Sequence, residues 1–364
     1  MENKKGKVVC AMSGGVDSSV AAALLKKEGF EVVGVFIKFW SDESDGKSKS
    51  ENRCCSSDSE RRARATAAKL KIPFYVLNLE KEFKKRVVDY FLDTYKKGFT
   101  PNPCVVCNKE IKFGLLMEKA LEWDADFIAT GHYARNVFDS RNKIYRLYKG
   151  KDKDKDQSYF LWMLDQKQLS RVLFPVGEYK KEEVRRIAKK MGLSVFNIPD
   201  SQEVCFIPGE VNDFLKKYLK VKPGKIVDDN NKELGGHLGL HFYTIGQRRG
   251  MNLPGGPFFV LDKVFKRNIL IVTKDQKKLF QKELKLDKIN WISGEKPIVL
   301  RIKIKIRYRQ KEARASIKIL SRRKLKIVFD ISQKAVTPGQ SAVFYNKEEL
   351  LGGAIIAWQG TSRK

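Results

Sequence analysis

Apolar and polar positions follow two different periods in the first part of the chain. Between Lys7 and about Ala134, short apolar runs rich in β-branched residues alternate with segments whose apolar residues recur every three to four positions. The runs KVVCAM, EVVGVFI, PFYVLNL and FIATGHY predict strands. The segments with helical period predict helices over about 17–28, 58–70 and 80–97, with another helix after Cys107.

Alternating strands and helices predict a parallel sheet covered on both faces, which is an α/β fold. In such sheets ligands bind beyond the carboxyl ends of the strands. The residues just after KVVCAM and FIATG are therefore where chemistry is expected. The polar, turn-rich segment Ser41 to Arg53 predicts a mobile loop. After a run of alternating charges from Gly150, the periodicity predicts two appended helices, over 166–173 and 180–191.

From about Ile207 the character of the chain changes. Glycines, prolines and short apolar runs predict a small β-rich module. After Lys277, the run RIKIKIRYR (301–309) alternates basic and apolar residues, which predicts a strand with one buried face. Together with ASIKIL and KLKIVFD it predicts a C-terminal antiparallel sheet or β-barrel. The predicted domains are 1–206, 207–277 and 278–364.

Composition narrows the class of protein. The length of 364 residues suggests two or three domains, and 42% hydrophobic residues indicate a globular chain. No apolar run approaches the ~20 residues that span a bilayer, and the N-terminus lacks the apolar stretch of a secretory signal. We expect a cytoplasmic protein without a membrane role.

The charge is strongly basic. Seventy-three Lys and Arg against 43 Asp and Glu give +30, which favours a polyanionic partner or reflects a lysine-rich proteome. Its distribution favours RNA: Arg301 to Lys326 holds twelve Lys and Arg and one acid, Glu312, on a strand face that should meet solvent. The alternative is a soluble strand face whose lysines only block aggregation.

A glycine-rich loop lies between the first predicted strand and helix. In SGGVDSS (13–19), amides at the helix N-terminus and the positive end of the helix dipole can hold phosphate. Gly14 and Gly15 allow close backbone approach, and Ser13 and Ser18 add hydroxyl donors. The loop has no Lys, so it is not a Walker A loop.

Asp17 in this loop could orient it or help to hold Mg²⁺ on the phosphates.

The segment SGGVDS resembles the SGGxDS signature of the PP-loop ATP pyrophosphatase superfamily, whose catalytic domain is adenine nucleotide alpha hydrolase-like. The resemblance implies activation of a carbonyl oxygen by adenylation with release of pyrophosphate. The superfamily includes amidating synthetases as well as enzymes that thiolate tRNA, and the loop alone does not choose between them.

The cysteines favour sulfur chemistry. Six cysteines in a large cytosolic chain suggest catalysis or metal binding rather than a disulfide framework. Cys107, in TPNPCVVCNKEIKF, should lie at or near a helix N-terminus, which favours the thiolate. With Cys205, in DSQEVCFIP, it suits a persulfide relay in which one thiol holds sulfur and the other resolves a disulfide. We interpret Cys10 as buried packing, and Cys54 and Cys55 as incidental.

Seven blocks along nearly the whole chain resemble the tRNA-specific 2-thiouridylase (MnmA) family: SGGVDSSVAA, TPNPCVVCNKEIKFG, ATGHYA, KDQSYFL, DSQEVCFIP, FYTIGQRRG and TPGQSAVFY. The resemblance implies catalytic Cys107, a persulfide on Cys205, and a target uridine at the wobble position. It implies that ATP is bound by Ala11, Met12, Ser13, Gly14, Gly15, Val16, Asp17, Ser18, Ile37 and Gly131. It implies that the tRNA contacts Asn102, Pro103, Cys104, His132, Gln157, Ser158, Tyr159, Arg307, Tyr308 and Gln340.

The chain departs from this family at Cys104, where the usual motif has Asp. A thiol with a pKa near 8.5 is a poor substitute for a carboxylate. Cys104, Cys107 and Cys205 form a CxxC plus one distant Cys, a set that could hold a [4Fe-4S] cluster with one iron open to sulfide. This cluster and the persulfide are the two alternatives for the sulfur step. A structural zinc site is less favoured, because no fourth ligand is evident.

The expected function is ATP-dependent thiolation of tRNA, with a sulfur-delivery protein or sulfide as the second partner and no role with DNA. The target base must leave its stack to reach a pocket between Asn102 and the second cysteine segment. A non-catalytic RNA-binding protein is the main alternative, against which the intact SGGVDS, Cys107 and Cys205 argue. An amidating synthetase would need an ammonia source, for which we see no second catalytic region.

Overall fold

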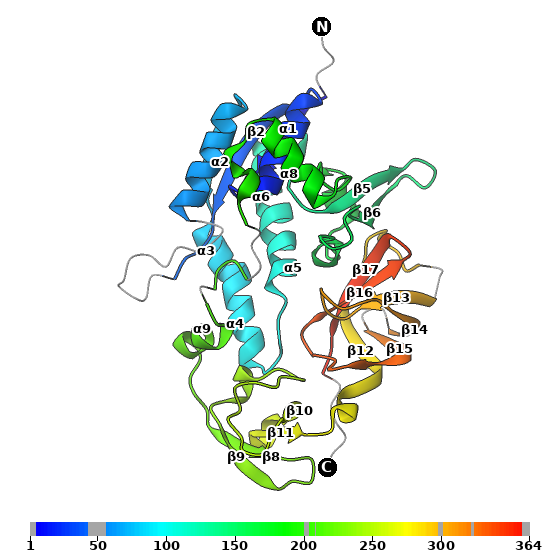
Figure 1. The fold of residues 1–364 in the computed structure, drawn as a ribbon. Coiled ribbons are helices and arrows are strands. Elements are labelled where there is room, and N and C mark those ends of the chain that lie inside the picture. Colours follow the sequence, from blue (N-terminus) through cyan, green and yellow to red (C-terminus); the bar gives the residue numbers. More distant parts are fainter. Residues whose placement is uncertain are drawn as a thin grey trace.

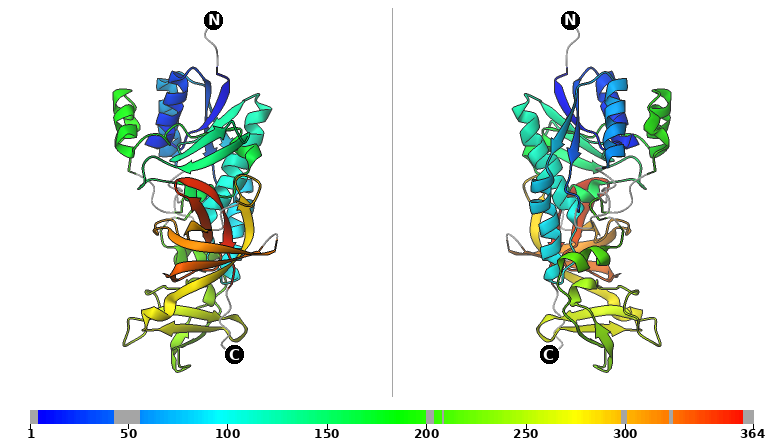
Figure 2. Two further views of the ribbon diagram at one scale, coloured as in Figure 1. Left: turned by 90° about the vertical axis from the view of Figure 1, so that its right-hand side faces the viewer. Right: turned by 90° about the vertical axis from the view of Figure 1, so that its left-hand side faces the viewer.

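The computed structural model describes residues 5–42, 56–199, 204–207, 209–297, 301–321 and 324–358. It is elongated, with three parts along its long axis: a sheet with helices at one end, a β-barrel in the middle and a smaller β region at the other end (Figures 1 and 2). Cys54, Cys55 and most of the predicted mobile loop, residues 43–53, lie outside the described residues. Among the helices of the described ranges, none has the length and apolarity that crossing a bilayer requires.

The N-terminal sheet is parallel, as the alternating pattern predicts. Its strand order is β3-β2-β1-β4-β7, and every pairing in it is parallel. The chain runs outward from β1 to β2 and β3, then returns to place β4 on the other side of β1. The strands are β1 (Lys7–Ala11), β2 (Glu31–Lys38), β3 (Phe74–Asn78), β4 (Phe127–Ala129) and β7 (Val172–Leu173).

Helices cover both faces of this sheet, and each face has its own apolar core. One core packs α1 and α8 around β1 and β2, and the other packs the long helical segments between β3 and β4 against the opposite face. The helices of this part are α1 (Val16–Lys27), α2 (Ser57–Lys69), α3 (Glu80–Phe83), α4 (Asp89–Lys96), α5 (Pro103–Cys107), α6 (Leu116–Glu122), α7 (Gln166–Leu169) and α8 (Lys181–Lys190).

Three helix predictions need correction. The segment predicted as one helix over 80–97 contains a π-helical turn, Lys84–Val88, between α3 and α4. The helix expected after Cys107 begins earlier, at Pro103, and continues through a π-helical segment (Asn108–Leu115) into α6. Pro103 is the first helical residue, where its fixed φ and missing N–H are tolerated. In the helix predicted over 166–173, Val172–Leu173 is instead the short edge strand β7.

A hairpin from the first part of the chain joins the C-terminal sheet. Strands β5 (Ala134–Asp139) and β6 (Ile144–Lys149) pair with each other, and β6 pairs with β17 (Glu349–Ile356). The guanidinium of Arg146 reinforces the junction with a bond of 2.7 Å to the Glu349 carboxylate. The N-terminal part and the barrel are therefore joined by a β-ladder as well as by the connecting chain.

The C-terminal part is a closed antiparallel barrel, which confirms the predicted class. Within the described residues six strands follow the order β12-β15-β14-β13-β16-β17, and β12 also pairs with β17 to close the sheet. The predicted basic strand is shorter than expected, since β13 ends at Lys305, before Arg307 and Tyr308. The other barrel strands are β12 (Phe280–Trp291), β14 (Ala313–Ser321), β15 (Lys324–Lys334) and β16 (Ser341–Asn346).

The central part is β-rich, as predicted, but it begins with a helix. α9 (Val211–Tyr218) packs its apolar face on Phe91 of α4 and on Phe206. A sheet of order β10-β11-β8-β9 follows. Its strands are β8 (Gly224–Val227), β9 (Glu233–His237), β10 (Phe259–Val264) and β11 (Ile269–Thr273).

A buried lysine attaches this central sheet to the end of α4. Lys263 on β10 is only 3% exposed, and its ammonium donates to the carbonyl of Gly98 at 2.8 Å. Burial lowers the pKa of Lys263 to about 7, against the opposing effect of the neighbouring Asp262 carboxylate. The lysine loses its proton in the folded state at a pH where the unfolded chain still holds it.

This difference in pKa sets a pH dependence. Between pH 7 and about 10 the unfolded state binds more protons at Lys263 than the folded state, so stability from this group rises with pH, by about 1.4 kcal/mol per pH unit at most. Thermal unfolding of the wild type and of Lys263→Met at pH 7, 8.5 and 10 tests this. We expect the difference in midpoint, wild type minus variant, to grow with pH, and parallel profiles would contradict the assignment. The neighbouring His241 does not contribute to this dependence, because its pKa is lowered from 6.5 and it is therefore neutral between pH 7 and 10.

Candidate active site

The SGGVDSS segment forms a compact loop at the carboxyl end of β1. The Ser18 hydroxyl accepts from the Ser13 amide at 3.1 Å and lies 3.3 Å from both the Ser13 hydroxyl and the Gly15 carbonyl. Gly14 has a φ of +74°, and a Cβ there would meet the carbonyl oxygen of Ser59 at 2.1 Å. The glycine is therefore required both by the backbone conformation and by the close approach of α2.

The other predicted nucleotide residues converge on this loop. Ala11 and Ile37 are at or next to the carboxyl ends of β1 and β2, and Gly131 follows β4. A Cβ on Gly131 would lie 2.6 Å from the Ser18 amide, so this glycine lets the loop after β4 touch the start of α1. Because β1 and β4 are neighbours whose connections run to opposite sides, the loop occupies the point where a doubly wound sheet binds ligands. Met12 and Val16 are buried beneath it.

Asp17 is held by two groups distant in sequence. Its carboxylate accepts from the Lys181 ammonium at 2.7 and 2.8 Å and from the Tyr133 hydroxyl at 2.7 Å. Lys181 is 8% exposed and begins α8, whose first amide donates to Asp152 at 2.8 Å. Of the two roles expected for Asp17, these contacts support orientation of the loop.

Sequence reasoning missed Lys181 and Tyr133, and also Arg62. The Arg62 guanidinium donates to the Gly14 carbonyl at 3.1 Å and to the Ser59 hydroxyl at 2.9 Å, which fixes α2 beside the loop. One signal for Lys181 was available, because lysine in a first helical turn opposes the helix dipole and so needs another reason to be there.

Removing the Lys181 charge should loosen the nucleotide loop. In Lys181→Met the partly buried Asp17 carboxylate loses its ionic partner, so we expect the KM for ATP in tRNA-stimulated pyrophosphate release to rise about tenfold. Steady-state kinetics measures this. Lys190→Met, the same substitution at an exposed site in the last turn of α8, is the control and should change KM less than twofold. An unchanged KM in Lys181→Met would show that Asp17 holds the loop without it.

The predicted catalytic cysteines lie in one continuous apolar core. Cys107 is 6% exposed within it, and half-buried Cys205 packs against it beside Phe206. Phe206 in turn contacts Phe83 of α3 and Phe91 of α4, with ring centroids 5.7 and 5.4 Å apart. Cys107 is the last residue of α5, not the residue before a helix, so the first helical turn is N-terminal to it. Cys10 is fully buried in β1, as interpreted from its strand position.

The structure gives the iron–sulfur alternative no preformed set of ligands. In the part of the chain that the structure describes, which includes Cys104, Cys107 and Cys205, no three His, Cys, Asp or Glu side chains are gathered to hold a metal ion. Cys104 and Cys107 share one turn of α5, whereas Cys205 belongs to a separate segment anchored by the aromatic packing of Phe206.

Five of the predicted tRNA residues gather where the three parts of the molecule meet. The extended segment before α5 contacts both the barrel and the central part at this place. Gln340 donates to the carbonyls of Thr100 and Pro101 at 3.1 and 2.8 Å, and the Thr100 and Thr244 hydroxyls are 3.1 Å apart. Arg307 donates to the Ala335 carbonyl at 2.8 Å. The gathered residues are Asn102, Tyr159, Arg307, Tyr308 and Gln340.

Tyr159 connects the members of this junction. Its hydroxyl donates to the Ser341 carbonyl at 3.0 Å and is hydrogen-bonded to the side chain of Asn102. The Tyr308 ring lies 4.5 Å from that of Phe160 and 5.9 Å from that of Tyr159. Tyr159 is 1% exposed and Ser158 is fully buried, bonded through its hydroxyl to Tyr345 at 3.1 Å. These two residues therefore form the layer behind the surface.

Gln157 and His132 lie nearer to the nucleotide loop. The Gln157 side-chain carbonyl accepts from the Tyr133 amide at 3.0 Å, next to the tyrosine that holds Asp17. His132 is 2.7 Å from the Thr130 hydroxyl through Nδ1, and its ring packs against Phe113 and Phe174. Burial, with the nearby charge of Lys112, lowers the pKa of His132 well below its usual value. The imidazole is therefore neutral at physiological pH.

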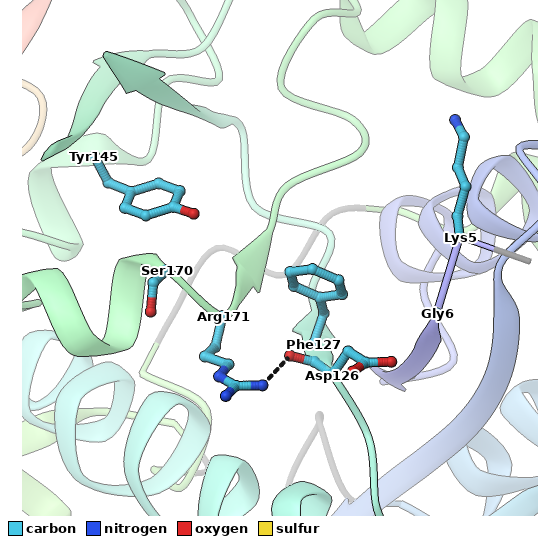
Figure 3. Close-up of a pocket in the computed structure, with 7 residues that line it drawn as sticks. All are labelled: Lys5, Gly6, Asp126, Phe127, Tyr145, Ser170 and Arg171. Atoms are coloured by element: carbon cyan, nitrogen blue, oxygen red, sulfur yellow. Dashed lines mark hydrogen bonds between the residues drawn. The ribbon is translucent and has the colours of Figure 1, made fainter. Parts of the chain in front are cut away.

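An open cavity lies away from these residues. It has a volume of about 580 Å³ and is lined by Lys5, Gly6, Asp126, Phe127, Tyr145, Ser170 and Arg171. Figure 3 shows the Arg171 guanidinium directed at the Asp126 carbonyl, 3.1 Å away. Gly6, Phe127 and Arg171 lie at the amino ends of the parallel strands, so this cavity is at the opposite end of the sheet from the nucleotide loop.

The barrel carries the basic surface that the sequence predicts. On neighbouring strands Lys303 is opposite Arg314, and Lys318 is opposite Lys326. Like charges directly across a ladder destabilise a sheet. A polyanion bound along this face would relieve that repulsion.

Comparison with known proteins covers nearly the entire chain. The family described as the tRNA methyl transferase HUP domain matches residues 6–209, the tRNA methyl transferase PRC-barrel domain matches 212–274, and the aminomethyltransferase beta-barrel domain matches 281–356. A relative from Thermoanaerobacter sp. (strain X514), tRNA-specific 2-thiouridylase MnmA 2, is 46% identical over 96% of this chain and 97% of its own length. The tRNA-specific 2-thiouridylase MnmA of Clostridioides difficile (strain 630) is 46% identical over 96% and 98%.

Solved structures resemble a smaller part of the chain. A 4-thiouridine synthetase in complex with RNA and ATP is 21% identical, with a TM-score of 0.35, over 55% of this chain and 44% of that one. An NMN synthetase from Francisella tularensis is 16% identical, with a TM-score of 0.33, over 55% and 67%.

Proposed function

The chain belongs to the tRNA-specific 2-thiouridylase (MnmA) family, and from this membership we propose that it uses ATP to replace the C2 oxygen of the wobble uridine of tRNA with sulfur. It is a sulfur-transferring enzyme of tRNA modification. The observation that carries the detailed proposal is the presence of a built phosphate loop and of two thiols, Cys107 and Cys205, on the same side-chain core.

The first step is adenylation. The amides and hydroxyls of Ala11 to Ser18 hold the phosphates of ATP at the positive end of α1, with Lys181 and Tyr133 keeping Asp17 in place. Mg²⁺ bound with the triphosphate would neutralise part of its negative charge. The C2 oxygen of the uridine attacks the α-phosphorus, and pyrophosphate leaves. The C2 carbon then carries AMP as its leaving group.

The second step is sulfur transfer. The outer sulfur of a Cys205 persulfide attacks C2, and AMP leaves with the original oxygen. The Cys107 thiolate then attacks the Cys205 sulfur. The bond between Cys205 and the transferred sulfur breaks, which yields 2-thiouridine and a disulfide between Cys107 and Cys205. The outer sulfur on Cys205 comes from the persulfide of a sulfur-delivery protein: the Cys205 thiolate attacks that sulfur, and the thiolate of the delivery protein leaves.

The tRNA is held by the barrel and by the junction. The basic face of β13, β14 and β15 contacts phosphates, while Arg307, Tyr308 and Gln340 guide the anticodon loop toward Asn102. Pro103, Cys104, His132 and Gln157 complete this path, with Ser158 and Tyr159 supporting it from behind. We place the domain limits at 206/207 and 277/278, and the enzyme in the cytoplasm with its substrate.

Nucleoside mass analysis tests the proposal. Undermodified tRNA is incubated with the enzyme, ATP and a sulfur donor, with iron supplied or withheld, and pyrophosphate is measured in parallel. We expect 2-thiouridine at the wobble position, one pyrophosphate for each base modified and the same yield without iron. A protein that only binds RNA would release no pyrophosphate, and a strict need for iron would refute the persulfide step.

A further inference from the structure

Cys104 and Cys107 form a CxxC pair on one helical turn. Both belong to α5 (Pro103–Cys107), with Cys104 second from its start. Residues three apart on a helix have Cβ atoms about 5–6 Å apart, and a disulfide needs Cβ atoms about 3.5–4.5 Å apart. A small adjustment at the end of the helix closes this difference, as in the CxxC motifs of disulfide oxidoreductases.

The two thiols differ in exposure. Cys107 is 6% exposed and belongs to the apolar core, whereas Cys104 is only half-buried. Both are thiols in the structure, as is Cys205. A reductant arriving from solvent therefore reaches the Cys104 sulfur more readily than the Cys107 sulfur.

The proposed reaction creates a need for such a thiol. Each turnover leaves a disulfide between Cys107 and Cys205, which must be reduced before Cys205 can accept sulfur again. The Cys107 sulfur of this disulfide lies in the apolar core. A neighbouring thiol on the same helix has a high effective concentration toward that sulfur, because only a short, already ordered segment separates the two.

We propose that Cys104 is the resolving thiol that regenerates Cys205 after each sulfur transfer, an inference that rests on the proposed function. The Cys104 thiolate attacks the sulfur of Cys107. The bond from Cys107 to Cys205 breaks, a bond from Cys104 to Cys107 forms, and the Cys205 thiolate takes up the proton that Cys104 released. A dithiol reductant then reduces the disulfide on α5, restoring both thiols and becoming oxidised itself.

This role requires a thiol at position 104, where the family resemblance implies Asp. A carboxylate at position 104 could act in proton transfer but could not form a sulfur–sulfur bond. The substitution of Asp by Cys therefore exchanges one chemistry for another rather than approximating it. The alternative is that Cys104 stands in for the carboxylate as an acid or base, and the same experiment decides between the two.

The experiment maps the disulfide left by a single turnover. Protein loaded with sulfur at Cys205 from sodium polysulfide is mixed with ATP and tRNA without reductant, quenched in acid, alkylated with N-ethylmaleimide and analysed by peptide mass spectrometry. We expect the wild type to contain a Cys104–Cys107 disulfide and alkylated Cys205. Cys104→Ser should contain the Cys107–Cys205 disulfide instead. A Cys107–Cys205 disulfide in the wild type would overturn the proposal, as would a Cys104–Cys107 disulfide that forms equally without ATP.

Kinetics supplies the second measurement. With dithiothreitol present and tRNA saturating, the ratio of the steady-state rate to the single-turnover rate should be about tenfold lower in Cys104→Ser than in the wild type. Cys104→Asp, which restores the family's usual residue, should show the same loss. Full turnover in Cys104→Asp would identify Cys104 as an acid or base and refute its redox role. Failure of the wild type to form 2-thiouridine in a single turnover would instead refute the proposed function itself.

Discussion

Replacing Cys107 by serine is expected to reduce formation of 2-thiouridine by about a thousandfold or more, because a hydroxyl is a far weaker nucleophile toward sulfur than a thiolate and cannot form the disulfide that releases the product. Cys107 is almost fully buried in the core, and the oxygen is similar in size to the sulfur, so the fold should survive. Mass analysis of tRNA nucleosides after reaction measures the loss.

The adenylation step provides the internal control for this variant. The nucleotide loop is built from residues 11–18 and held by Lys181, and none of these contacts involves Cys107. We therefore expect Cys107→Ser to release pyrophosphate in the first turnover at a rate close to that of the wild type. Normal thiolation by Cys107→Ser would show that the nucleophile lies elsewhere.

Replacing Gly14 by alanine should abolish the earlier, ATP-dependent step, with a loss of about a hundredfold or more in pyrophosphate release. The added Cβ would lie 2.1 Å from the Ser59 carbonyl oxygen, in a backbone conformation with φ of +74° that L side chains rarely adopt. Backbone cannot move aside cheaply, so either α2 or the loop must shift. ATP-binding assays and tRNA-dependent release of pyrophosphate both measure the result.

Gly29 supplies a matched control at the other end of the same helix. It also has a positive φ, +92°, but a Cβ there meets nothing within 4 Å. Gly29→Ala therefore carries the cost of backbone strain, about 1 kcal/mol, without the steric clash. We expect it to lower stability slightly and to keep pyrophosphate release within about twofold of the wild type. Equal losses in the two variants would mean that strain alone, not contact with α2, explains the effect at Gly14.

Local patterns were sufficient to predict the elements that recur with a clear period. The strands KVVCAM and EVVGVFI appear where continuous apolar runs place them, the barrel strands ASIKIL and KLKIVFD appear where alternating apolar residues do, and the glycine-rich loop at 13–19 lies between the first strand and helix. The start of α5 was misplaced, because the helix was expected after Cys107 although Pro103 is well suited to the first turn of a helix.

Features that depend on distant contacts could not be predicted in this way. β7 has two residues and therefore no period, and it is a strand only because β4 offers an edge to pair with. Lys181 stands out locally only because it opposes the dipole of its helix, and its partner Asp17, 164 positions earlier, could not be inferred from that. The packing of Cys205 beside Phe206 could not be predicted either, since its spacing from Cys104 and Cys107 along the chain says nothing of where its segment packs.

The ladder between β6 and β17 has a consequence for synthesis of the protein. Arg146 and Glu349, which meet across that ladder, are separated by 203 residues. At a translation rate of about 5–20 residues per second, the hairpin waits on the order of 10–40 s for its partner strand to leave the ribosome. Throughout that time the outer edge of β6 presents unpaired backbone groups to the crowded cell. A nascent chain that stalls before β17 would thus be vulnerable at a site far upstream of the stall.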